Sequence, residues 1–347
     1  ELDVLSQHSA LALLKSIVIE SISGIKRLQD ETEIVRELCE WVEYLPLGLE
    51  LIGCYLVENS DVSMSEMLKQ LKESKISDEP FDDPSENIGL TARRGVVSAL
   101  ELSWKDLTKE AKKIAYILSC FADTAIAWKL VEHCLSDQEL KFLRKIRNKY
   151  LLNLHFIKQY ESEENTYRVH RLVRQFFKFK LEHYPDKEKL KQQFSCALLE
   201  LQFVVDLHDI PTVNLSYDDV ELFRHLAVHI EEIALNFHEV LDTDNLLVPS
   251  KVLAKFYEYE GSYDEAIKWG EHNLYLAEND SCNEKLLTNI VFSLSDLSLI
   301  YLHAGYLEKA EENIERAIDI CQKINGLYIP DLRLNLESVY HKQMCNE

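Results

Sequence analysis

Apolar residues recur three and four positions apart along most of this chain, the spacing that places them on one face of an α-helix. Only 9 glycines and 7 prolines interrupt the pattern over 347 residues. In the first part of the chain it predicts helices over 6–22, 31–44, 47–58 and 63–73, the last one opened by a Ser63 and Glu66 capping box. The chain is therefore predicted to be mainly α-helical.

One short stretch departs from the helical spacing. Residues 155–160 and 166–170 flank the polar segment 161–165, which is the pattern of a β-hairpin with a solvated loop. From Leu172 onward, apolar residues return at helical spacing. His170 is therefore expected where a strand ends and a helix starts.

Shifts in composition divide the chain into four regions. Residues 1–74 form a helical subdomain, and 75–95, where Asp, Glu, Ser and Pro are frequent, form a surface linker. Residues 96–184 contain three helices near 105–122, 127–135 and 137–150, then the hairpin and a last helix, which is the order found in a winged helix. Residues 185–347 are all helical.

The last region contains an internal repeat. The segment Gly261–Ala266 recurs as Gly305–Ala310, with a leucine and a tyrosine at matching positions before each glycine, namely Leu253 and Tyr257, then Leu297 and Tyr301. Glycine permits a tight turn, and the small alanine allows two helices to pack closely. The pattern resembles tetratricopeptide (TPR) helix pairs, and it predicts an α-solenoid whose surface binds a protein or peptide. A further helix over 332–344 repeats the pattern in part, and 186–248 hold no clean copy.

The composition narrows the classes of function. With 46% hydrophobic and 28% charged residues and no apolar run of membrane length, no membrane-spanning segment is expected. The first residues show neither a secretory signal nor a Met, so we expect a cytoplasmic chain that begins partway through a longer protein. The eight cysteines never form a Cys-x-x-Cys pair and are expected to be reduced thiols in or near the cores. A net charge of −22 disfavours nucleic acids and anionic membranes as partners and favours proteins.

No motif for catalysis is present. The chain contains no Gly-x-x-x-x-Gly-Lys-Ser/Thr loop, no Gly-x-Gly-x-x-Gly loop and no Gly-x-Ser-x-Gly nucleophile motif, so it is not expected to be an enzyme and has no predicted catalytic residue. His225 and His229 share a helical face near Glu232, but this spacing alone is a weak metal signal, and a surface or packing role without metal is expected.

Two residues are candidates for contact with a ligand. At a helix start, the exposed N–H groups and the helix dipole favour an anion, and a neutral His170 can donate a hydrogen bond to a phosphate. The alternative is that His170 only caps the helix. Pro46 suits the first turn of its helix, and its rigid apolar ring also suits contact with an aromatic base. A purely structural role for Pro46 is the alternative.

Three motifs in order point to a known family. Leu45–Leu49 resembles the Gly-Leu-Pro-Leu string of NB-ARC modules, Ala99–Trp104 resembles the start of their winged-helix subdomain, and Val169–Val173 stands at their Met-His-Asp position. The chain thus resembles the carboxy-terminal part of the NB-ARC module of STAND-type nucleotide switches, followed by TPR repeats. Two positions depart from the family pattern, with Tyr44 in place of a glycine and Arg171 in place of an aspartate.

The resemblance implies that Pro46 lies against the adenine and His170 contacts the β-phosphate of ADP. It implies ADP or ATP in the intact protein, held with an upstream nucleotide-binding domain, and no cofactor in this chain alone. Exchange of ADP for ATP would then rotate the winged helix and permit homo-oligomerisation in defence or stress signalling, with a protein ligand sensed by the repeats.

Two other functions stay open at the level of sequence. One is a TPR-type protein-binding scaffold with no nucleotide role. The other is a winged-helix transcriptional regulator, because the predicted third helix is basic, with Lys141, Arg144, Lys145, Arg147 and Lys149. The acidic hairpin loop and the acidic chain argue against the second of these.

Overall fold

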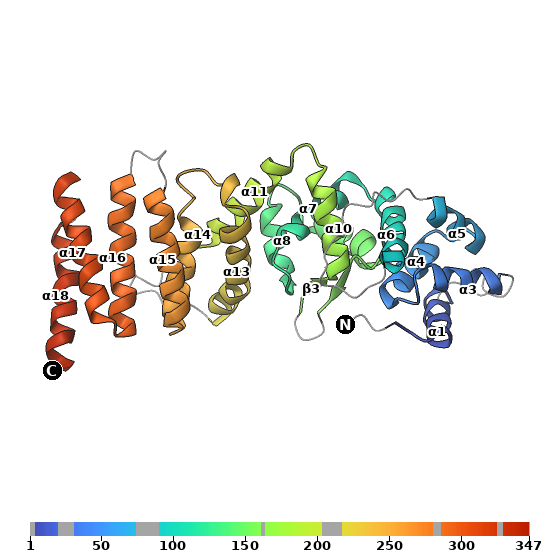
Figure 1. Cartoon of the computed structure of the whole chain (residues 1–347). Helices are drawn as coiled ribbons and strands as arrows, with labels where there is room; N and C mark the ends of the chain where they lie inside the picture. Colours follow the sequence, from blue (N-terminus) through green and yellow to red (C-terminus); the bar gives the residue numbers. More distant parts are fainter. Residues whose placement is uncertain are drawn as a thin grey trace. The chain divides into compact units, whose positions relative to one another are not determined.

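The computed structural model describes residues 4–19, 31–73, 90–160, 164–202, 217–279, 286–324 and 329–346. They form a mainly α-helical protein with a small antiparallel sheet, which confirms the predicted fold class (Figure 1). The chain divides into two compact units, unit 1 over Glu1–Lys187 and unit 2 over Glu188–Glu347. The predicted start of the repeat region, residue 185, lies three residues before the start of unit 2.

The described residues 4–73 of unit 1 form four helices, each of which overlaps a helix predicted from the apolar spacing. Their bounds are α1 (Gln7–Val18), α3 (Thr32–Trp41), α4 (Pro46–Glu58) and α5 (Met64–Glu73). The Ser63 hydroxyl accepts a hydrogen bond from the Glu66 N–H at 3.1 Å, which confirms the predicted cap of α5. Helices α1 and α6 pack against α4, most of whose residues are buried.

Helix α4 approaches its neighbours closely because it carries two glycines. A Cβ at Gly48 would lie 2.7 Å from the Cβ of Val42, and a Cβ at Gly53 would lie 2.8 Å from a methyl carbon of Ile17. Both distances are shorter than van der Waals contact, so larger residues would push α4 away from α1 and from the end of α3. The glycines therefore determine where the start of α4, with Pro46, can lie.

The prediction of a linker over residues 75–95 is wrong for residues 90–95. Residues 90–95 are the start of α6 (Leu90–Lys105), while 74–89 lie outside the described residues. The polar composition was misleading because a helix needs apolar residues only on its packed face, and Val96, Val97 and Leu100 provide that face here. At Gly95, α6 crosses the end of α3, where a Cβ would lie 2.3 Å from the Trp41 carbonyl oxygen.

The helix predicted over 105–122 begins too early. Lys105 is the last residue of α6, and the next helix is α7 (Lys109–Cys120). Thr108 caps α7 through its hydroxyl, which accepts from the Ala111 N–H at 3.2 Å. The apolar spacing continues across the turn between α6 and α7, so it does not reveal where one helix ends and the next begins. A Thr before a charged first turn, as at Thr108, is nevertheless a typical N-cap signal.

The sheet has a strand that the sequence analysis did not predict. The hairpin strands β2 (Ile157–Gln159) and β3 (Thr166–Val169) are joined by β1 (Ile126–Ala127), in the order β1-β3-β2. A two-residue strand carries no period-2 signal, so only its pairing with β3 reveals it. The helices predicted at 127–135 and 137–150 are α8 (Trp128–Cys134) and α9 (Leu140–Ile146), and α9 continues as a π-helical segment, η1 (Arg147–Leu152).

An aromatic cluster holds the helix that follows the sheet, α10 (Arg171–Glu182). The Trp104 ring lies 5.6 Å from Phe176 in an edge-to-face arrangement and 5.9 Å from Phe177, measured between ring centroids. Lys180 of α10 also donates to the Glu101 carboxylate of α6 at 2.5 Å. Packing of this kind adds directional attraction to the burial of large apolar surfaces, so α10 is firmly placed against α6.

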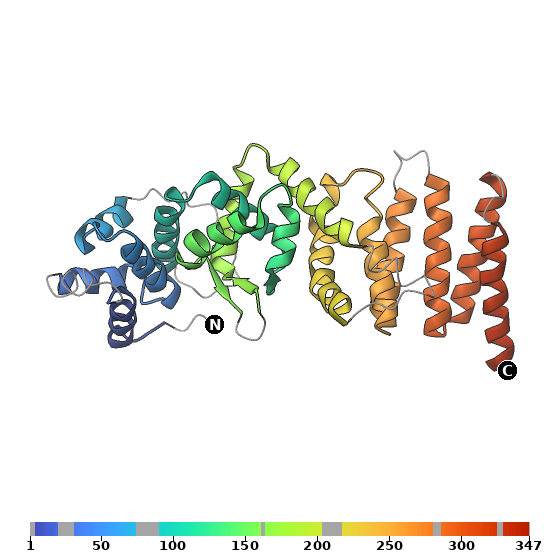
Figure 2. The same ribbon diagram turned by 180° about the vertical axis from the view of Figure 1, so that it is seen from behind.

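Within the described residues, all the regular secondary structure of unit 2 is helical. Its helices are α11 (Lys187–Leu199), α13 (Tyr217–Asn236), α14 (Val248–Tyr259), α15 (Tyr263–Asn279), α16 (Leu286–Ala304), α17 (Leu307–Ile324) and α18 (Ile329–Asn346), with 3-10 turns at Glu200–Gln202 and His238–Val240. Helices α14–α18 stand side by side in both views (Figure 1, Figure 2). The repeat predicted from the sequence corresponds to the pairs α14/α15 and α16/α17, followed by α18.

The repeat glycines and alanines have the roles predicted for them. Gly261 and Gly305 have φ of +74° and +89° in the turns within the two pairs, a conformation that favours glycine. Ala266 and Ala310 are fully buried where the second helix of each pair packs on the first. The pairs are thus tight helix-turn-helix units.

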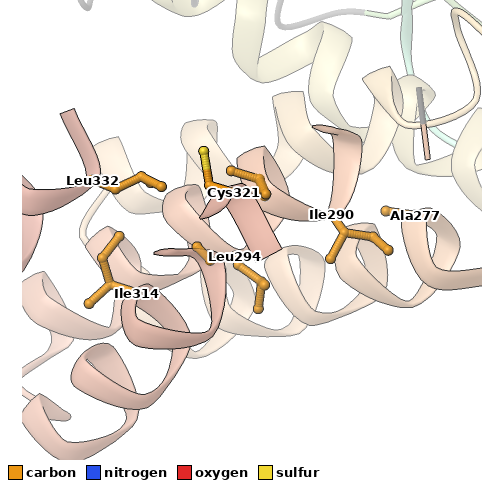
Figure 3. Close-up of a cluster of buried hydrophobic side chains, with 8 residues drawn as sticks. Ala277, Ile290, Leu294, Ile314, Cys321 and Leu332 are labelled. Atoms are coloured by element: carbon orange, nitrogen blue, oxygen red, sulfur yellow. The ribbon is translucent and has the colours of Figure 1, made fainter. Parts of the chain in front are cut away.

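A core joins the second pair to its neighbours. Figure 3 shows side chains from α15, α16, α17 and α18 meeting in one cluster, which includes Ile290, Leu294, Ile314, Cys321 and Leu332. Cys39, Cys54, Cys120 and Cys134 are buried in unit 1 in the same way, as expected for core thiols.

One described segment, 287–304 in α16, is long and apolar enough to cross a membrane by length and composition. Half of it is buried against neighbouring helices, as in the core helix of a repeat.

The contact between α6 and α3 provides a test of the fold. Replacing Gly95 by Ala places a Cβ against the Trp41 carbonyl oxygen, and we expect a loss of about 1–3 kcal/mol in the free energy of unfolding. Chemical denaturation monitored by circular dichroism measures it. Lys105→Ala, at an exposed position of the same helix, is the control, and equal stability of the two variants would contradict the close approach.

Candidate functional site

Pro46 is the first residue of α4, as predicted. It follows Leu45, which has an extended backbone with φ −71° and ψ 126°, and it is half-buried. The missing N–H of proline costs nothing here, because the first N–H groups of a helix have no partner within the helix. Part of its ring is therefore at the surface, in a rigid position at the start of α4.

Tyr44, which stands where the resembling family has glycine, adopts a left-handed backbone. Its φ is +57°, and that of Glu43 is +48°. A residue with a Cβ is strained in this region, whereas glycine adopts it readily. The turn is held by hydrogen bonds from the Tyr44 N–H to the Cys39 carbonyl at 2.9 Å and from the Leu5 N–H to the Tyr44 carbonyl at 3.1 Å. The backbone that precedes Pro46 is thus one that glycine fits, although the residue is tyrosine.

His170 caps α10. It lies between β3 and Arg171 with an extended backbone, and its Nδ1 accepts a hydrogen bond from the Leu172 N–H at 3.2 Å. The capping role considered as an alternative is therefore confirmed. It does not by itself exclude contact with a phosphate, because a neutral imidazole that accepts through Nδ1 carries its proton on Nε2. The cap thus sets the tautomer of the neutral ring, with its proton on Nε2.

Two carboxylates of α4 connect this helix to the hairpin. Glu50 Oε2 accepts from Lys158 Nζ of β2 at 2.6 Å and lies 3.7 Å from Nδ1 of His155. Glu58, two turns further along α4, accepts from the Asn153 side chain at 3.0 Å. Lys158 pairs across the sheet with Arg168, two residues before His170. The structure thus connects the helix that begins at Pro46 to the sheet whose strand β3 ends just before His170.

The charge of Glu50 depends on these contacts. Burial acts to raise its pKa, but the interactions with His155 and Lys158 outweigh burial, and the pKa is lowered from its usual value. The carboxylate is therefore ionised at neutral pH, and removing it would leave the Lys158 ammonium without this partner. A half-buried ion pair of this kind is sensitive to loss of either member.

The basic helix that suggested DNA binding is less available than its sequence indicates. Arg147 is buried, with its guanidinium 5.1 Å from the Trp128 ring centroid and 4.8 Å from that of Tyr167. Burial lowers the pKa of Arg147. Arg144 is held by Glu132 at 2.8 Å. The basic face that would enter a groove is therefore partly used within the fold.

The candidate metal residues lie in unit 2. His229 is fully buried and His225 is half-buried on α13, as expected for residues that pack within a helical core. Within the described ranges, no group of three or more His, Cys, Asp or Glu is placed to hold a metal ion.

Glu50 and Lys158 were not among the site residues predicted from the sequence. A signal for Glu50 was available, because Glu50 and Glu58 are the charged residues of an otherwise apolar helix. A charge on a helix that is buried on nearly all sides usually has a partner. Lys158 carried no signal, since an exposed lysine on a hairpin strand is common.

No protein-family model matches the chain, and no curated protein matches it in sequence. Among solved structures, it is similar to a Signal Transduction ATPase with Numerous Domains (STAND) protein with a tetratricopeptide repeat sensor from Pyrococcus horikoshii. The sequence identity is 14% and the TM-score is 0.34. The similarity covers 98% of this chain and 57% of that chain, so this chain spans little more than half of that protein's length. At this TM-score the likeness is coarse and establishes neither a shared function nor a shared site.

The Glu50 ion pair makes the stability of unit 1 depend on pH. Because the folded pKa of Glu50 is depressed, its stabilising effect is present above the unfolded value of about 4.5 and is lost as the pH falls through the folded pKa. We expect Glu50→Gln to lower the denaturation midpoint at pH 7 and to have a smaller effect near pH 3. Glu164→Gln, at an exposed position after the hairpin loop, is the control. A Glu50→Gln effect that is constant from pH 7 to pH 3 would contradict the ion pair.

Relief of backbone strain at Tyr44 provides a second test. We expect Tyr44→Gly to raise the Tm by about 2 °C, because glycine adopts a φ of +57° without the steric cost borne by tyrosine. Differential scanning calorimetry measures it. Tyr44→Ala removes the same ring but retains a Cβ, so a Tm for Tyr44→Ala as high as that of Tyr44→Gly would show that strain is not the cause.

Proposed function

We propose that this chain is the sensor and regulatory segment of a STAND-type ATP/ADP-dependent signalling switch and that it performs no catalysis of its own. In this proposal His170 donates from Nε2 to the β-phosphate of ADP, and the ring of Pro46 lies against the adenine. The observation that carries the proposal is the His170 cap, because acceptance through Nδ1 makes Nε2 the donor.

The phosphate-binding loop would come from a nucleotide-binding domain, because no such loop occurs in these 347 residues. The start of α10 adds to the attraction for an anion through its N-terminal N–H groups. No acidic side chain lies in the first turn of α10 to oppose that attraction. ADP would thus be contacted by this chain at two points and held mainly elsewhere.

The contacts between α4 and the hairpin suit a switch. They include polar side-chain pairs, namely Glu50 with Lys158 and His155, and Glu58 with Asn153 just before the hairpin. Interfaces of this kind separate at a smaller cost than a large apolar core. We propose that loss of the His170 contact on exchange of ADP for ATP breaks these polar contacts, frees the hairpin from α4 and permits homo-oligomerisation, in defence or stress signalling.

A second candidate function is favoured by unit 2. Its helix pairs form a stack with a cavity between α14, α15 and α16, which suits recognition of a protein or peptide. A scaffold without any nucleotide role would use this unit alone. Transcriptional regulation is disfavoured, since Arg147 is buried and Arg144 is engaged by Glu132.

Substitutions at His170 separate its two roles. Asn retains an N-cap side chain but lacks an N–H donor in the place of Nε2, whereas Ala removes both. In a protein that joins this chain to its nucleotide-binding domain, we expect His170→Asn to speed release of fluorescently labelled ADP by about ten-fold at nearly unchanged Tm. His170→Ala should speed release equally and also lower the Tm. Stopped-flow fluorescence and calorimetry measure the two effects.

The controls for this experiment lie within the same chain. Thr108→Ala removes the cap of α7 and should lower the Tm without changing ADP release. Titration calorimetry of ADP with the 347-residue chain alone is expected to detect no binding, because that chain has no phosphate loop. Unchanged ADP release in both His170 variants would reject the nucleotide contact and leave the scaffold function.

A further inference from the structure

A cavity of about 270 Å³ lies in unit 2 between α14, α15 and α16. Its lining comes from the segment before α14 and from all three helices. The volume is below the usual range for drug-sized ligands and suits one side chain of a larger partner. The cavity has a polar floor, an apolar wall and a charged rim.

The floor is a preorganised hydrogen-bond chain. Asn273 of α15 is 6% exposed, and its Nδ2 donates to the Leu247 carbonyl at 2.8 Å. Its Oδ1 accepts from the Ser293 hydroxyl of α16 at 2.7 Å. These bonds orient the Ser293 oxygen so that its hydrogen points to Asn273 and its lone pairs remain as acceptors.

The rim carries more negative than positive charge. Asp244 and Asp296 line the cavity together with one cation, Lys251, whose Nζ lies 4.0 Å from Asp296 Oδ2. Two carboxylates against one ammonium leave the rim net negative. The surrounding unit reinforces this sign, since residues 188–347 contain 29 Asp and Glu but only 12 Lys and Arg.

The wall presents an aromatic ring beside these carboxylates. Phe292 of α16 lines the cavity and is 43% exposed, an unusual exposure for a phenylalanine. Leu247 and Val248 complete the apolar part. An aromatic face next to carboxylates attracts a cation that also carries an aliphatic stem, as the side chains of lysine and arginine do.

We propose that this cavity binds a lysine or arginine side chain of a basic peptide segment in the protein that unit 2 recognises. The cation pairs with Asp244 and Asp296, its stem packs on Phe292, and one of its N–H groups donates to Ser293. The proposal rests on the protein-recognition part of the proposed function and is independent of nucleotide binding.

An anionic ligand, such as a peptide carboxylate, fits the same cavity less well. Its cationic partner would be Lys251, which already neighbours Asp296, and one N–H of Asn273 is already used by Leu247. An anion would also meet two carboxylates at the rim. Like charges brought together at a partly desolvated site reduce affinity.

Anisotropy of labelled peptides with the full 347-residue chain tests the proposal. The probes are three ten-residue peptides in which leucine alternates with arginine, glutamine or glutamate, used at about 150 mM salt so that distant charges are screened. We expect binding of the arginine peptide only. Asp244→Asn combined with Asp296→Asn should weaken it at least about ten-fold.

A matched control removes the same charge elsewhere in unit 2. Asp264→Asn combined with Asp319→Asn changes two exposed aspartates of α15 and α17, and it should change the affinity by less than about two-fold. Phe292→Ala should weaken binding without any change of charge. Equal losses in the two double variants would show non-specific attraction and overturn the proposal.

The sign of the effect at Lys251 separates a cation site from an anion site. Lys251→Gln removes the competing ammonium and should strengthen binding of the arginine peptide about three-fold. Lys323→Gln, at an exposed position of α17, is its control. Weaker binding in Lys251→Gln, preference for the glutamate peptide, or no binding of the arginine peptide would overturn the proposal. None of these outcomes affects the ADP-release test of His170.

Discussion

The close approach of helices at small residues is the constraint on which both units depend. Gly48 and Gly53 let α4 lie against Val42 and Ile17, and Gly95 lets α6 cross the end of α3. In unit 2, a Cβ at Gly270 would lie 2.9 Å from a methyl carbon of Leu297. Interiors are packed too tightly to accept an added methyl group at such points. The positions of α4 and α6 therefore follow from where their glycines stand.

Polar contacts then use the positions that packing provides. Glu50 of α4 contacts Lys158 of the hairpin at 2.6 Å, and the Trp104 ring of α6 packs on α10. His170 is thereby fixed between a strand and a helix, with its tautomer set by the Leu172 N–H. A single histidine thus provides a cap for the fold and a donor suited to a phosphate.

In unit 2, the residues that build the helix pairs differ from the residues that line the cavity. Gly261 and Gly305 turn the chain between the two helices of each pair, and Ala266 and Ala310 are buried within the pairs. Residues outside the repeat pattern, such as Asp244 and Phe292, line the cavity. In the proposed recognition, the stack keeps its packing while the cavity lining sets the charge and shape of the ligand, as is typical of repeat proteins.

By itself, the sequence determined the helical class, the hairpin, the cap of α5, Pro46 at a helix start and the repeat with its two positive-φ glycines. These features depend on local spacing and on backbone preferences that act over a few residues. Only the tertiary structure decided the strand β1, the start of α6 within the predicted linker, the pairing of Glu50 with Lys158, and the cavity at Asn273. Each of these joins segments distant in the chain, through backbone pairing or side-chain contacts that leave no periodic pattern. The capping of α10 by His170 lies between the two cases. His170 and Leu172 are close in sequence, but only the folded geometry shows that Nδ1 accepts the hydrogen bond.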